Sequence, residues 1–233
     1  MLEVNGVNSF YGKAQVLNDL NFTVDRGTVV ALLGRNGAGK TTTMKSIMQL
    51  VRPRQGKIIY QGQDITGWPS HKVARNGLGY VPEERRIFTQ LTVMENLEVG
   101  RQPPRDGCTT WTEDMVFDLF PNLAERRHNR GKALSGGEQQ MLTIARTLMG
   151  NPAFILLDEP SEGIAPVIVE QMARVILQLK AEGLTVLLSE QNLHFAQAVA
   201  DGVVIIEHGT QKFVGTLAAL QSQPEIRDQY LSV

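Results

Sequence analysis

One short segment, residues 34–41, constrains the fold of this chain more than any other. It reads Gly-Arg-Asn-Gly-Ala-Gly-Lys-Thr and satisfies the pattern G-x-x-x-x-G-K-[ST]. An apolar run over residues 28–33 precedes it, and a helical pattern over residues 40–50 follows it. Because the glycines let the backbone turn tightly, successive N–H groups point at one spot, to which the helix adds its positive end. The segment therefore predicts an α/β fold with a site for the phosphates of a nucleotide.

Single residues of this loop have expected roles. Lys40 is expected to reach the β- and γ-phosphates, and the Thr41 hydroxyl to coordinate Mg²⁺. A glycine-rich turn in an unrelated fold is the alternative, but the strand before the loop and the helix after it favour the phosphate site. The predicted nucleotide-binding residues are Gly34, Arg35, Asn36, Gly37, Ala38, Gly39, Lys40, Thr41 and Thr42.

A second apolar strand, predicted at residues 154–157, is followed by two carboxylates. Asp158 is expected to hold Mg²⁺ through its water shell, and Glu159 to polarise an attacking water. An acidic turn before Pro160 is the simpler interpretation of this pair when it is taken alone. Together with the loop at 34–41, the pair predicts a chain that binds and hydrolyses a nucleoside triphosphate.

The order of the predicted elements indicates a mainly parallel, covered β-sheet, because strands separated by helices form βαβ units. Strands are predicted at 2–7, 16–24, 28–33 and 57–60, then at 154–157, 184–189 and, as the final strand, 203–207. Helices are predicted at 40–50, 113–120, 138–149, 166–180 and 193–200. Residues 85–150 are rich in helical patterns and poor in strand patterns, which marks them as an inserted helical subdomain.

Composition excludes several classes of protein. The chain has 233 residues, with 23 basic and 24 acidic side chains, and this balance argues against a nucleic-acid binder. A single cysteine, Cys108, excludes an intrachain disulfide framework. No apolar run approaches the ~20 residues that span a bilayer, and the N-terminal residues show no signal-peptide pattern. We therefore expect a cytosolic chain that works at a membrane only by docking on another protein.

A third motif lies between the two halves of the predicted nucleotide site. Residues 134–140 read Leu-Ser-Gly-Gly-Glu-Gln-Gln, which offers a hydroxyl and free N–H groups at a helix N-terminus. An ordinary serine N-cap is the alternative. In this order of motifs, the chain resembles the ATP-binding subunits of ABC transporters, whose signature is Leu-Ser-Gly-Gly-Gln or a close variant. The resemblance covers residues 2 to about 215.

The resemblance implies a fold, a ligand and further site residues. It implies one cassette domain over residues 1–233, with a RecA-like P-loop core at about 1–84 and 151–233, an antiparallel β portion near the N-terminus and a helical subdomain at about 85–150. ATP and Mg²⁺ are the implied cofactors. Tyr11 matches the aromatic residue that stacks on adenine, although a half-buried core tyrosine is the alternative. The residues implied to bind the ATP held by a second subunit are Ser135, Gly136, Gly137 and Glu138.

Finer matches point to one branch of the family. Segments 64–67, 81–83, 85–88, 91–97 and 189–192 resemble the ATPases of branched-chain amino acid importers. The Ile164-Ala165-Pro166 sequence fits the same branch. The ATPase of urea or short-amide importers is a close alternative, because it shares many of these sequence segments.

Three positions depart from the broad family pattern. Glu83 stands where the family usually has glutamine, and it is still expected to touch Mg²⁺ or its water. Ala165 stands where an aspartate makes a polar contact across the dimer. Gln191 replaces the switch histidine; its amide can donate to a γ-phosphate oxygen but cannot carry a positive charge. We expect hydrolysis to rest mainly on Glu159, with Gln191 positioning.

The resemblance also implies partners. These are a second ABC ATPase subunit, identical or paralogous, polytopic permease subunits contacted near residues 83–96, and a periplasmic or extracellular substrate-binding protein. The expected location is the cytoplasmic face of the inner membrane, as a peripheral subunit, with no nucleic-acid partner. A soluble ABC ATPase acting on ribosomes or DNA and a non-hydrolysing regulatory subunit remain as alternatives. The sequence leaves the transported substrate open.

Overall fold

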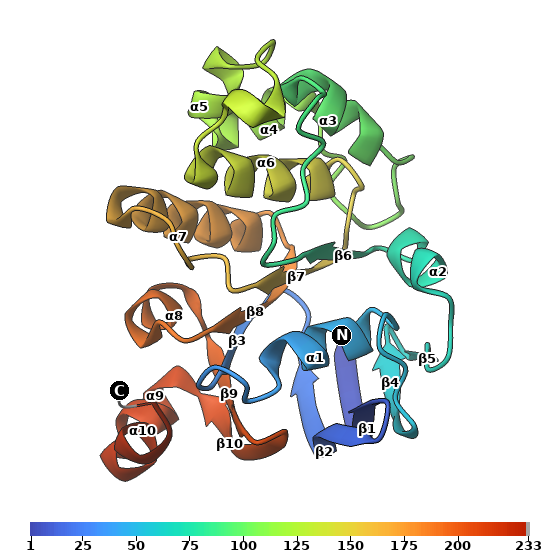
Figure 1. Cartoon of the computed structure of the whole chain (residues 1–233), viewed down its shortest axis with the longest axis vertical. Coiled ribbons are helices and arrows are strands. Elements are labelled where there is room, and N and C mark those ends of the chain that lie inside the picture. The colour runs from blue at the N-terminus through green and yellow to red at the C-terminus, as the bar shows by residue number, and fades with distance from the viewer. Residues whose placement is uncertain (232–233) are drawn as a thin grey trace.

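The computed structural model describes residues 1–231 and contains two β-sheets with helices around them (Figure 1). The larger sheet has the strand order β10-β9-β3-β8-β7-β6. Its strands are β3 (Val29–Leu33), β6 (Leu78–Val81), β7 (Phe154–Asp158), β8 (Thr185–Glu190), β9 (Gly202–Glu207) and β10 (Thr210–Thr216). All neighbouring strands run parallel except β10, which is antiparallel to β9. The expectation of a mainly parallel sheet is confirmed.

The smaller sheet is antiparallel and lies beside the first, with the strand order β2-β1-β4-β5. Its strands are β1 (Leu2–Tyr11), β2 (Ala14–Val24), β4 (Gln55–Tyr60) and β5 (Gln63–Asp64). The predicted strands at 2–7 and 16–24 are therefore parts of one longer hairpin. This sheet confirms the antiparallel portion expected near the N-terminus.

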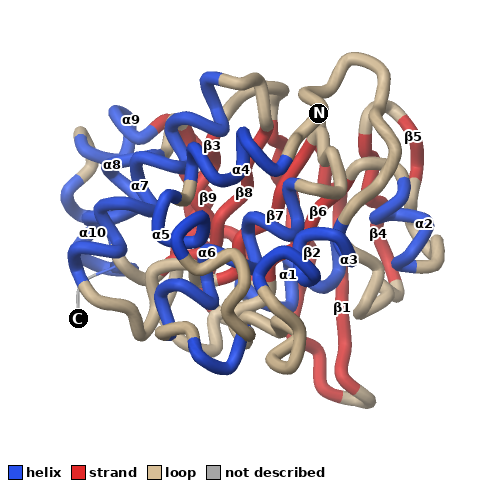
Figure 2. Tube along the Cα trace, turned by 90° about the horizontal axis from the view of Figure 1, so that it is seen from above, coloured by secondary structure: helices blue, strands red, loops and turns tan. Residues whose placement is uncertain are grey.

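Helices cover the larger sheet, and α7 to α10 gather on the side away from β4 and β5 (Figure 2). The helices of the core are α1 (Lys40–Ile47), α2 (Ser70–Arg75), α7 (Pro166–Ala181), α8 (Leu193–Val199), α9 (Leu217–Gln221) and α10 (Pro224–Leu231). Between β6 and β7 the chain forms α3 (Val93–Gly100), α4 (Glu113–Leu119), α5 (Pro121–Glu125), the 3-10 helix η1 (Gly131–Ala133) and α6 (Gly136–Leu148). These five lie together at one end of the molecule, in the segment predicted to be an inserted subdomain.

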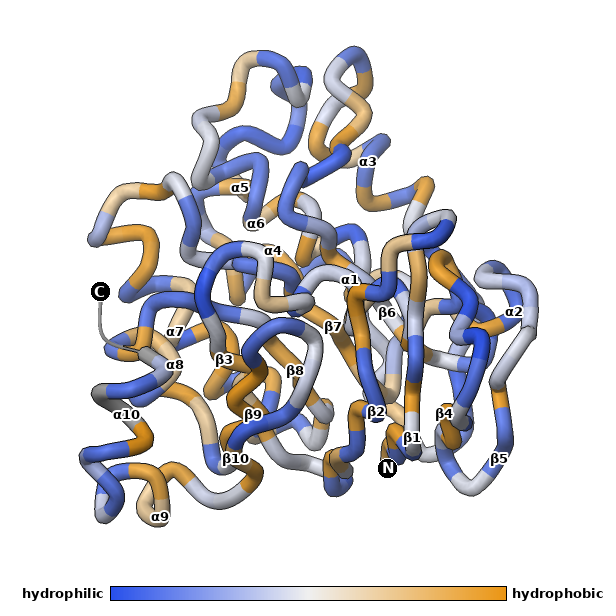
Figure 3. Tube along the Cα trace, turned by 60° about the horizontal axis from the view of Figure 1, so that its bottom comes forward, coloured by the Kyte–Doolittle hydropathy of each residue, from blue (hydrophilic) through white to orange (hydrophobic). Residues whose placement is uncertain are grey.

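The core has two parts, one on each face of the larger sheet. Side chains alternate along a strand, so β3 contributes Val29, Ala31 and Leu33 to the part covered by α6, α7 and α8. It contributes Val30 and Leu32 to the opposite part, which packs on α1 and the antiparallel sheet. Hydrophobic positions accordingly gather along strands β8 and β9 (Figure 3). Because β3 is anchored on both faces, the loop that follows it begins from a fixed point.

The prediction left out strands of the larger sheet. No strand was predicted at residues 78–81, but they form β6 and pair with β7. Residues 203–207 were expected to be the final strand, but β10 follows them after a two-residue turn. His208 and Gly209 both have positive φ, 48° and 73°, which is the geometry of a tight hairpin.

The helix predictions at 113–120 and 166–180 agree with α4 and α7 within one residue. The predicted helix at 40–50 ends earlier, since α1 stops at Ile47 and Gln49 adopts a positive φ of 58°. The predicted helix at 138–149 begins two residues earlier, at Gly136. Among residues 1–231, no helix combines the length and the apolar character that crossing a membrane requires.

A candidate nucleotide-binding site

The loop between β3 and α1 has a shape that only glycine permits at two positions. A Cβ on Gly34 would lie 2.4 Å from the carbonyl oxygen of Ile206, closer than any side chain tolerates. Gly39 has a φ of 110° immediately before α1. No side chain described in the structure caps this helix, and its first residues line a cavity of about 470 Å³. The helix N-terminus is therefore open to an anion.

Loop residues and carboxylates together line this cavity. The loop contributes Asn36, Gly37, Gly39, Lys40, Thr41 and Thr42, and Val16 lies beside them. Glu83, Glu159 and Glu162 provide the carboxylates. The structure thus brings most of the predicted phosphate-binding residues together with Glu83 and Glu159.

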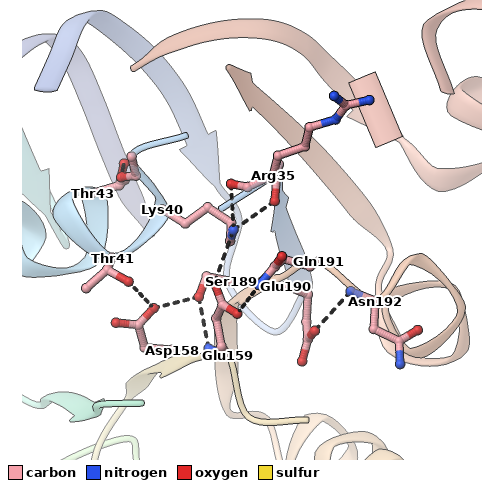
Figure 4. Close-up of polar contacts among 12 residues, drawn as sticks. Arg35, Lys40, Thr41, Thr43, Asp158, Glu159, Ser189, Glu190, Gln191 and Asn192 are labelled. Atoms are coloured by element: carbon pink, nitrogen blue, oxygen red, sulfur yellow. Dashed lines mark hydrogen bonds and ion pairs between the residues drawn. The ribbon is translucent and has the colours of Figure 1, made fainter. Parts of the chain in front are cut away.

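Lys40 is folded back over its own loop (Figure 4). Its Nζ donates to the carbonyl oxygens of Gly34 at 2.7 Å and Arg35 at 3.1 Å. The same Nζ lies 3.1 Å from Oε1 of Glu159, and the two side chains are only 3% and 7% exposed. A buried ion pair of this kind places one cation and one carboxylate beside the cavity, where each offsets the charge of the other.

Asp158, at the end of β7, accepts three hydrogen bonds. Thr41 Oγ1 donates to its Oδ1 at 3.1 Å, Ser189 Oγ to the same oxygen at 2.7 Å, and the Tyr80 hydroxyl to Oδ2 at 3.0 Å. Burial raises the pKa of Asp158, although these three hydrogen bonds oppose the rise. The hydroxyl of Thr41 and the carboxylate of Asp158 are hard oxygen donors. They suit Mg²⁺, which typically takes one or two protein ligands together with phosphates and water.

Glu159 follows immediately and is held in a fixed orientation. Its backbone has a φ of 47°, and its N–H donates to Ser189 Oγ at 3.0 Å. Its Oε2 accepts a hydrogen bond of 2.6 Å from the amide of Gln191. Burial acts to raise the pKa of Glu159, but hydrogen bonds with Glu162 and Gln191 and the charge of Lys40 hold it below its ordinary value. The group is therefore an ionised carboxylate beside the cavity.

Two further carboxyl groups face Glu159. A hydrogen bond with Glu159 raises the pKa of Glu162 to about 7, and burial and nearby carboxylates add to the rise. Burial, together with the charges of Glu159 and Asp158, raises the pKa of Glu83. The cavity thus concentrates negative charge, which a bound Mg²⁺ would offset.

The remaining predicted residues lie elsewhere. Tyr11 ends β1, is 48% exposed and does not line the cavity. Ser135 caps α6: its Oγ accepts from the Glu138 N–H at 3.3 Å, and its own N–H donates to Glu138 Oε2 at 2.7 Å. Glu138 also pairs with Arg126 at 2.7 Å. Residues 135–138 therefore form a separate helix N-terminus, which the structure does not bring to the phosphate loop of the same chain.

Several residues around the site were not among the predicted ones. They are Tyr80, Glu162, Ser189 and Glu190. Tyr80 and Ser189 lie on β6 and β8, the strands on either side of β7. The signal that could have found Ser189 is its place near the carboxyl end of a parallel strand, where ligand sites of α/β sheets gather.

Comparison with known proteins gives consistent results. Residues 17–162 match the family model for ABC transporters. The chain is 43% identical over 231 residues to the high-affinity branched-chain amino acid transport ATP-binding protein BraG of Pseudomonas aeruginosa, covering 99% of both chains. It is 37% identical over 233 residues to the lipopolysaccharide export system ATP-binding protein LptB of Haemophilus influenzae, covering 99% of this chain and 97% of that protein.

Solved structures agree with this result. An ATP-binding subunit of an ABC transporter superposes with a TM-score of 0.81 at 31% identity, covering 97% of this chain and 94% of that one. A nucleotide-free ATP-binding cassette gives a TM-score of 0.82 at 24% identity, covering 97% and 96%, and so agrees in fold. With its phosphate loop, carboxylate pair and helix-capping signature, the chain belongs to the ABC transporter family and is an ATP-binding, ATP-hydrolysing cassette subunit.

Proposed function

We propose that this chain powers an importer of branched-chain or related amino acids. The observation that carries the proposal is the 43% identity to BraG, which extends over 99% of both chains. The relation to LptB at 37% identity makes an ATPase of lipopolysaccharide export the second candidate. The urea or short-amide importer rests on the sequence resemblance alone.

ATP binds, in this proposal, at the loop of residues 34–42, with Tyr11 against the adenine. The Nζ of Lys40 exchanges the carbonyls of Gly34 and Arg35 for phosphate oxygens, to which its charge is better matched. That movement breaks the ion pair with Glu159 and frees Oε1. Nucleotide binding and activation of the carboxylate are therefore coupled through one lysine.

Glu159 then accepts a hydrogen bond from the attacking water and draws its proton, as a general base does. The ordinary pKa of a glutamate lies well below 7, and the hydrogen bonds with Glu162 and Gln191, which do not depend on Lys40, lower it further, so Glu159 stays ionised at neutral pH. Gln191 holds the carboxylate through the 2.6 Å hydrogen bond, and the second N–H of its amide is proposed to donate to a γ-phosphate oxygen. Thr41, Asp158 and Glu83 are proposed to hold Mg²⁺, which supplies charge neutralisation at the phosphates.

Two chains are proposed to enclose each ATP. Ser135, Gly136 and Gly137 present N–H groups at the start of α6, and Glu138 fixes that turn through the capping box. They are proposed to bind the γ-phosphate held by the partner, an identical or paralogous ATPase. Similar cassettes have been solved as dimers, at 21% and 22% identity to this chain. Closure would then depend on ATP, and the helical subdomain at about 85–150 would move toward the partner's RecA-like core.

A groove of about 560 Å³ is proposed to receive the permease. It lies between α2 and β6 on one side and α3 and α6 on the other. Phe88 and Val99 are 47% and 53% exposed there, and Arg146 lies over the Phe88 ring at 5.1 Å. Exposed apolar side chains beside a guanidinium suit an amphipathic segment of another protein. This contact would place the chain at the cytoplasmic face of the inner membrane, and a substrate-binding protein would act from the other side.

Reconstitution tests the direction and the substrate of transport. The chain is purified with the permease subunits encoded beside it and placed in proteoliposomes with the co-encoded binding protein. ATP-dependent uptake of labelled leucine, absent with Lys40→Ala, is expected. Uptake of urea or acetamide instead of leucine would replace the proposed substrate. Extraction of lipopolysaccharide, with no uptake of either solute, would overturn the importer and establish the exporter.

A further inference from the structure

Glu190, the last residue of β8, is a buried carboxylate that contacts neither the phosphate loop nor the predicted metal site. Its side chain is 2% exposed. Its Oε1 accepts from the N–H of Ser161 at 3.0 Å, and its Oε2 accepts from the N–H of Asn192 at 3.2 Å. One carboxylate thus holds two backbone segments, and Figure 4 shows it beside Asn192.

Those two segments carry the groups proposed for hydrolysis. Ser161 lies two residues after Glu159, and Asn192 immediately follows Gln191. The side chains of Gln191 and Glu159 are joined by a hydrogen bond of 2.6 Å, which the Gln191 amide donates. The strands below them, β7 and β8, are hydrogen-bonded neighbours. The Glu190 carboxylate joins the loops that follow these two strands, just beyond their last paired positions, Asp158 and Ser189.

Packing alone does not account for a glutamate at this place. Strand β8 is buried along its whole length, and an apolar side chain would fill the space without the cost of burying a carboxylate. A carboxylate with both oxygens bonded to backbone N–H groups instead fixes the direction of each loop. Loops are the parts of a fold that move most easily, so such a restraint matters most where geometry decides a rate.

We propose that Glu190 is a positioning residue for ATP hydrolysis, which sets the spacing between Glu159 and Gln191 by holding the backbone at Ser161 and Asn192. The proposal rests on the role of Glu159 proposed above. It involves no contact of Glu190 with ATP or Mg²⁺. Loss of the restraint therefore lowers kcat and leaves ATP affinity unchanged, because the phosphate loop is anchored on β3 and α1.

Single variants of Glu190 separate positioning from stability. Glu190→Ala removes both hydrogen bonds and is expected to lower kcat about 100-fold, the effect typical of a displacement of about 1 Å. Glu190→Gln keeps the shape and one acceptor, and is expected to lower kcat about tenfold. Gln49→Ala is the matched control: Gln49 is 4% exposed and also joins two backbone segments, accepting from Gly67 N and donating to Ser46 O. It is expected to lower the melting temperature and to leave kcat unchanged.

A double-variant cycle adds a readout that a structural role would not change. If Glu190 acts through Gln191, Glu190→Ala lowers kcat by a smaller factor in a Gln191→Ala background than in the wild type. The proposal would be overturned if Glu190→Ala lowered kcat by the same factor in both backgrounds. It would also be overturned if the kcat values of the two Glu190 variants were no lower than that of Gln49→Ala. Glu159→Gln is measured in parallel. Hydrolysis at the wild-type rate in that variant would refute the role of Glu159, whereas its loss beside an unimpaired Glu190→Ala would refute only the positioning role.

Discussion

Ser189→Ala perturbs the site at a residue that contacts both the Asp158 carboxylate and the backbone of Glu159. The hydroxyl is fully buried, donates to Asp158 at 2.7 Å and accepts from the Glu159 N–H at 3.0 Å. Alanine keeps the Cβ and the backbone hydrogen bonds of β8, so the change removes little besides the hydroxyl. The variant therefore measures two hydrogen bonds at the centre of the proposed catalytic geometry.

The expected loss of stability depends on the hydrogen bonds that Asp158 and the Glu159 N–H retain in the variant. Asp158 loses one charge-assisted hydrogen bond, worth about 1.5–3 kcal/mol, and retains those from Thr41 and Tyr80. The Glu159 N–H retains the backbone carbonyl of Ser189 at 3.2 Å, so its loss is small. The free energy of unfolding is expected to fall by about 2–3 kcal/mol, which corresponds to a melting temperature lower by about 5–10 °C.

Urea unfolding without nucleotide measures the loss, and single-turnover hydrolysis measures its effect on the reaction. The rate is expected to fall, because the backbone of Glu159 loses its side-chain anchor. Ser222→Ala is the control: that exposed hydroxyl donates only to Ala219 O at 2.8 Å, and its loss costs less than about 0.5 kcal/mol. A change for Ser189→Ala no larger than that of Ser222→Ala would refute the network inferred around Asp158.

Three further predictions use matched pairs within the chain. Ser135→Ala and Thr92→Ala each remove the hydroxyl of a capping box, and each is expected to lower the free energy of unfolding, measured in urea, by about 1 kcal/mol. Only Ser135→Ala is expected to slow steady-state ATP hydrolysis. Equal rates of hydrolysis in the two variants would contradict a place for Ser135 in the ATP site. Hydrogen bonds from the Thr92 N–H and hydroxyl lower the pKa of Glu95 below its ordinary 4.5, so its stabilisation is present above that pH and lost as the pH falls through the folded-state value. Urea unfolding should show Glu95→Gln to be less stable at pH 7 by a margin that vanishes in acid, and a constant margin would contradict this. Gly209→Ala places a Cβ 1.7 Å from Val16 O and is expected to lower the free energy of unfolding by more than about 3 kcal/mol. In Gly183→Ala the new Cβ meets no atom within 4 Å, so a loss of about 1 kcal/mol is expected from the positive φ alone. Similar shifts of the melting temperature in the two variants would refute the close approach at Gly209.

The sequence predicted those parts of the site that one continuous segment determines. The loop of residues 34–41 and the strand ending at Asp158 carry their own patterns, a glycine-rich turn and an unbroken apolar run. The sequence paired them because the two motifs occur together in one chain, and the structure gives the physical reason: β3 and β7 are parallel strands that end at the same edge of the sheet. The fold class followed for the same reason, since alternation of strands and helices limits the topology.

The remaining contacts depend on register and on tertiary contacts between distant segments. Ser189 faces Asp158 because β7 and β8 pair at those two positions, which no local pattern specifies. Strand β6 is short and contains a glycine, so its apolar pattern is weak, yet pairing with β7 makes it part of the sheet. Strand β10 has half-buried and exposed positions but no fully buried one, so its hydrophobic pattern is weak, and the turn at residues 208–209 is its main local signal.

The proposed catalytic role of Glu159 is tested most directly by single-turnover hydrolysis in Glu159→Gln. Glutamine preserves the size of the side chain and its hydrogen bond with Gln191, but it cannot take a proton from water. With ATP binding verified by a separate titration, the rate is expected to fall about 10²- to 10⁴-fold, the contribution typical of a general base. Hydrolysis near the wild-type rate would contradict the proposed mechanism and move the base to another carboxyl group of the cavity.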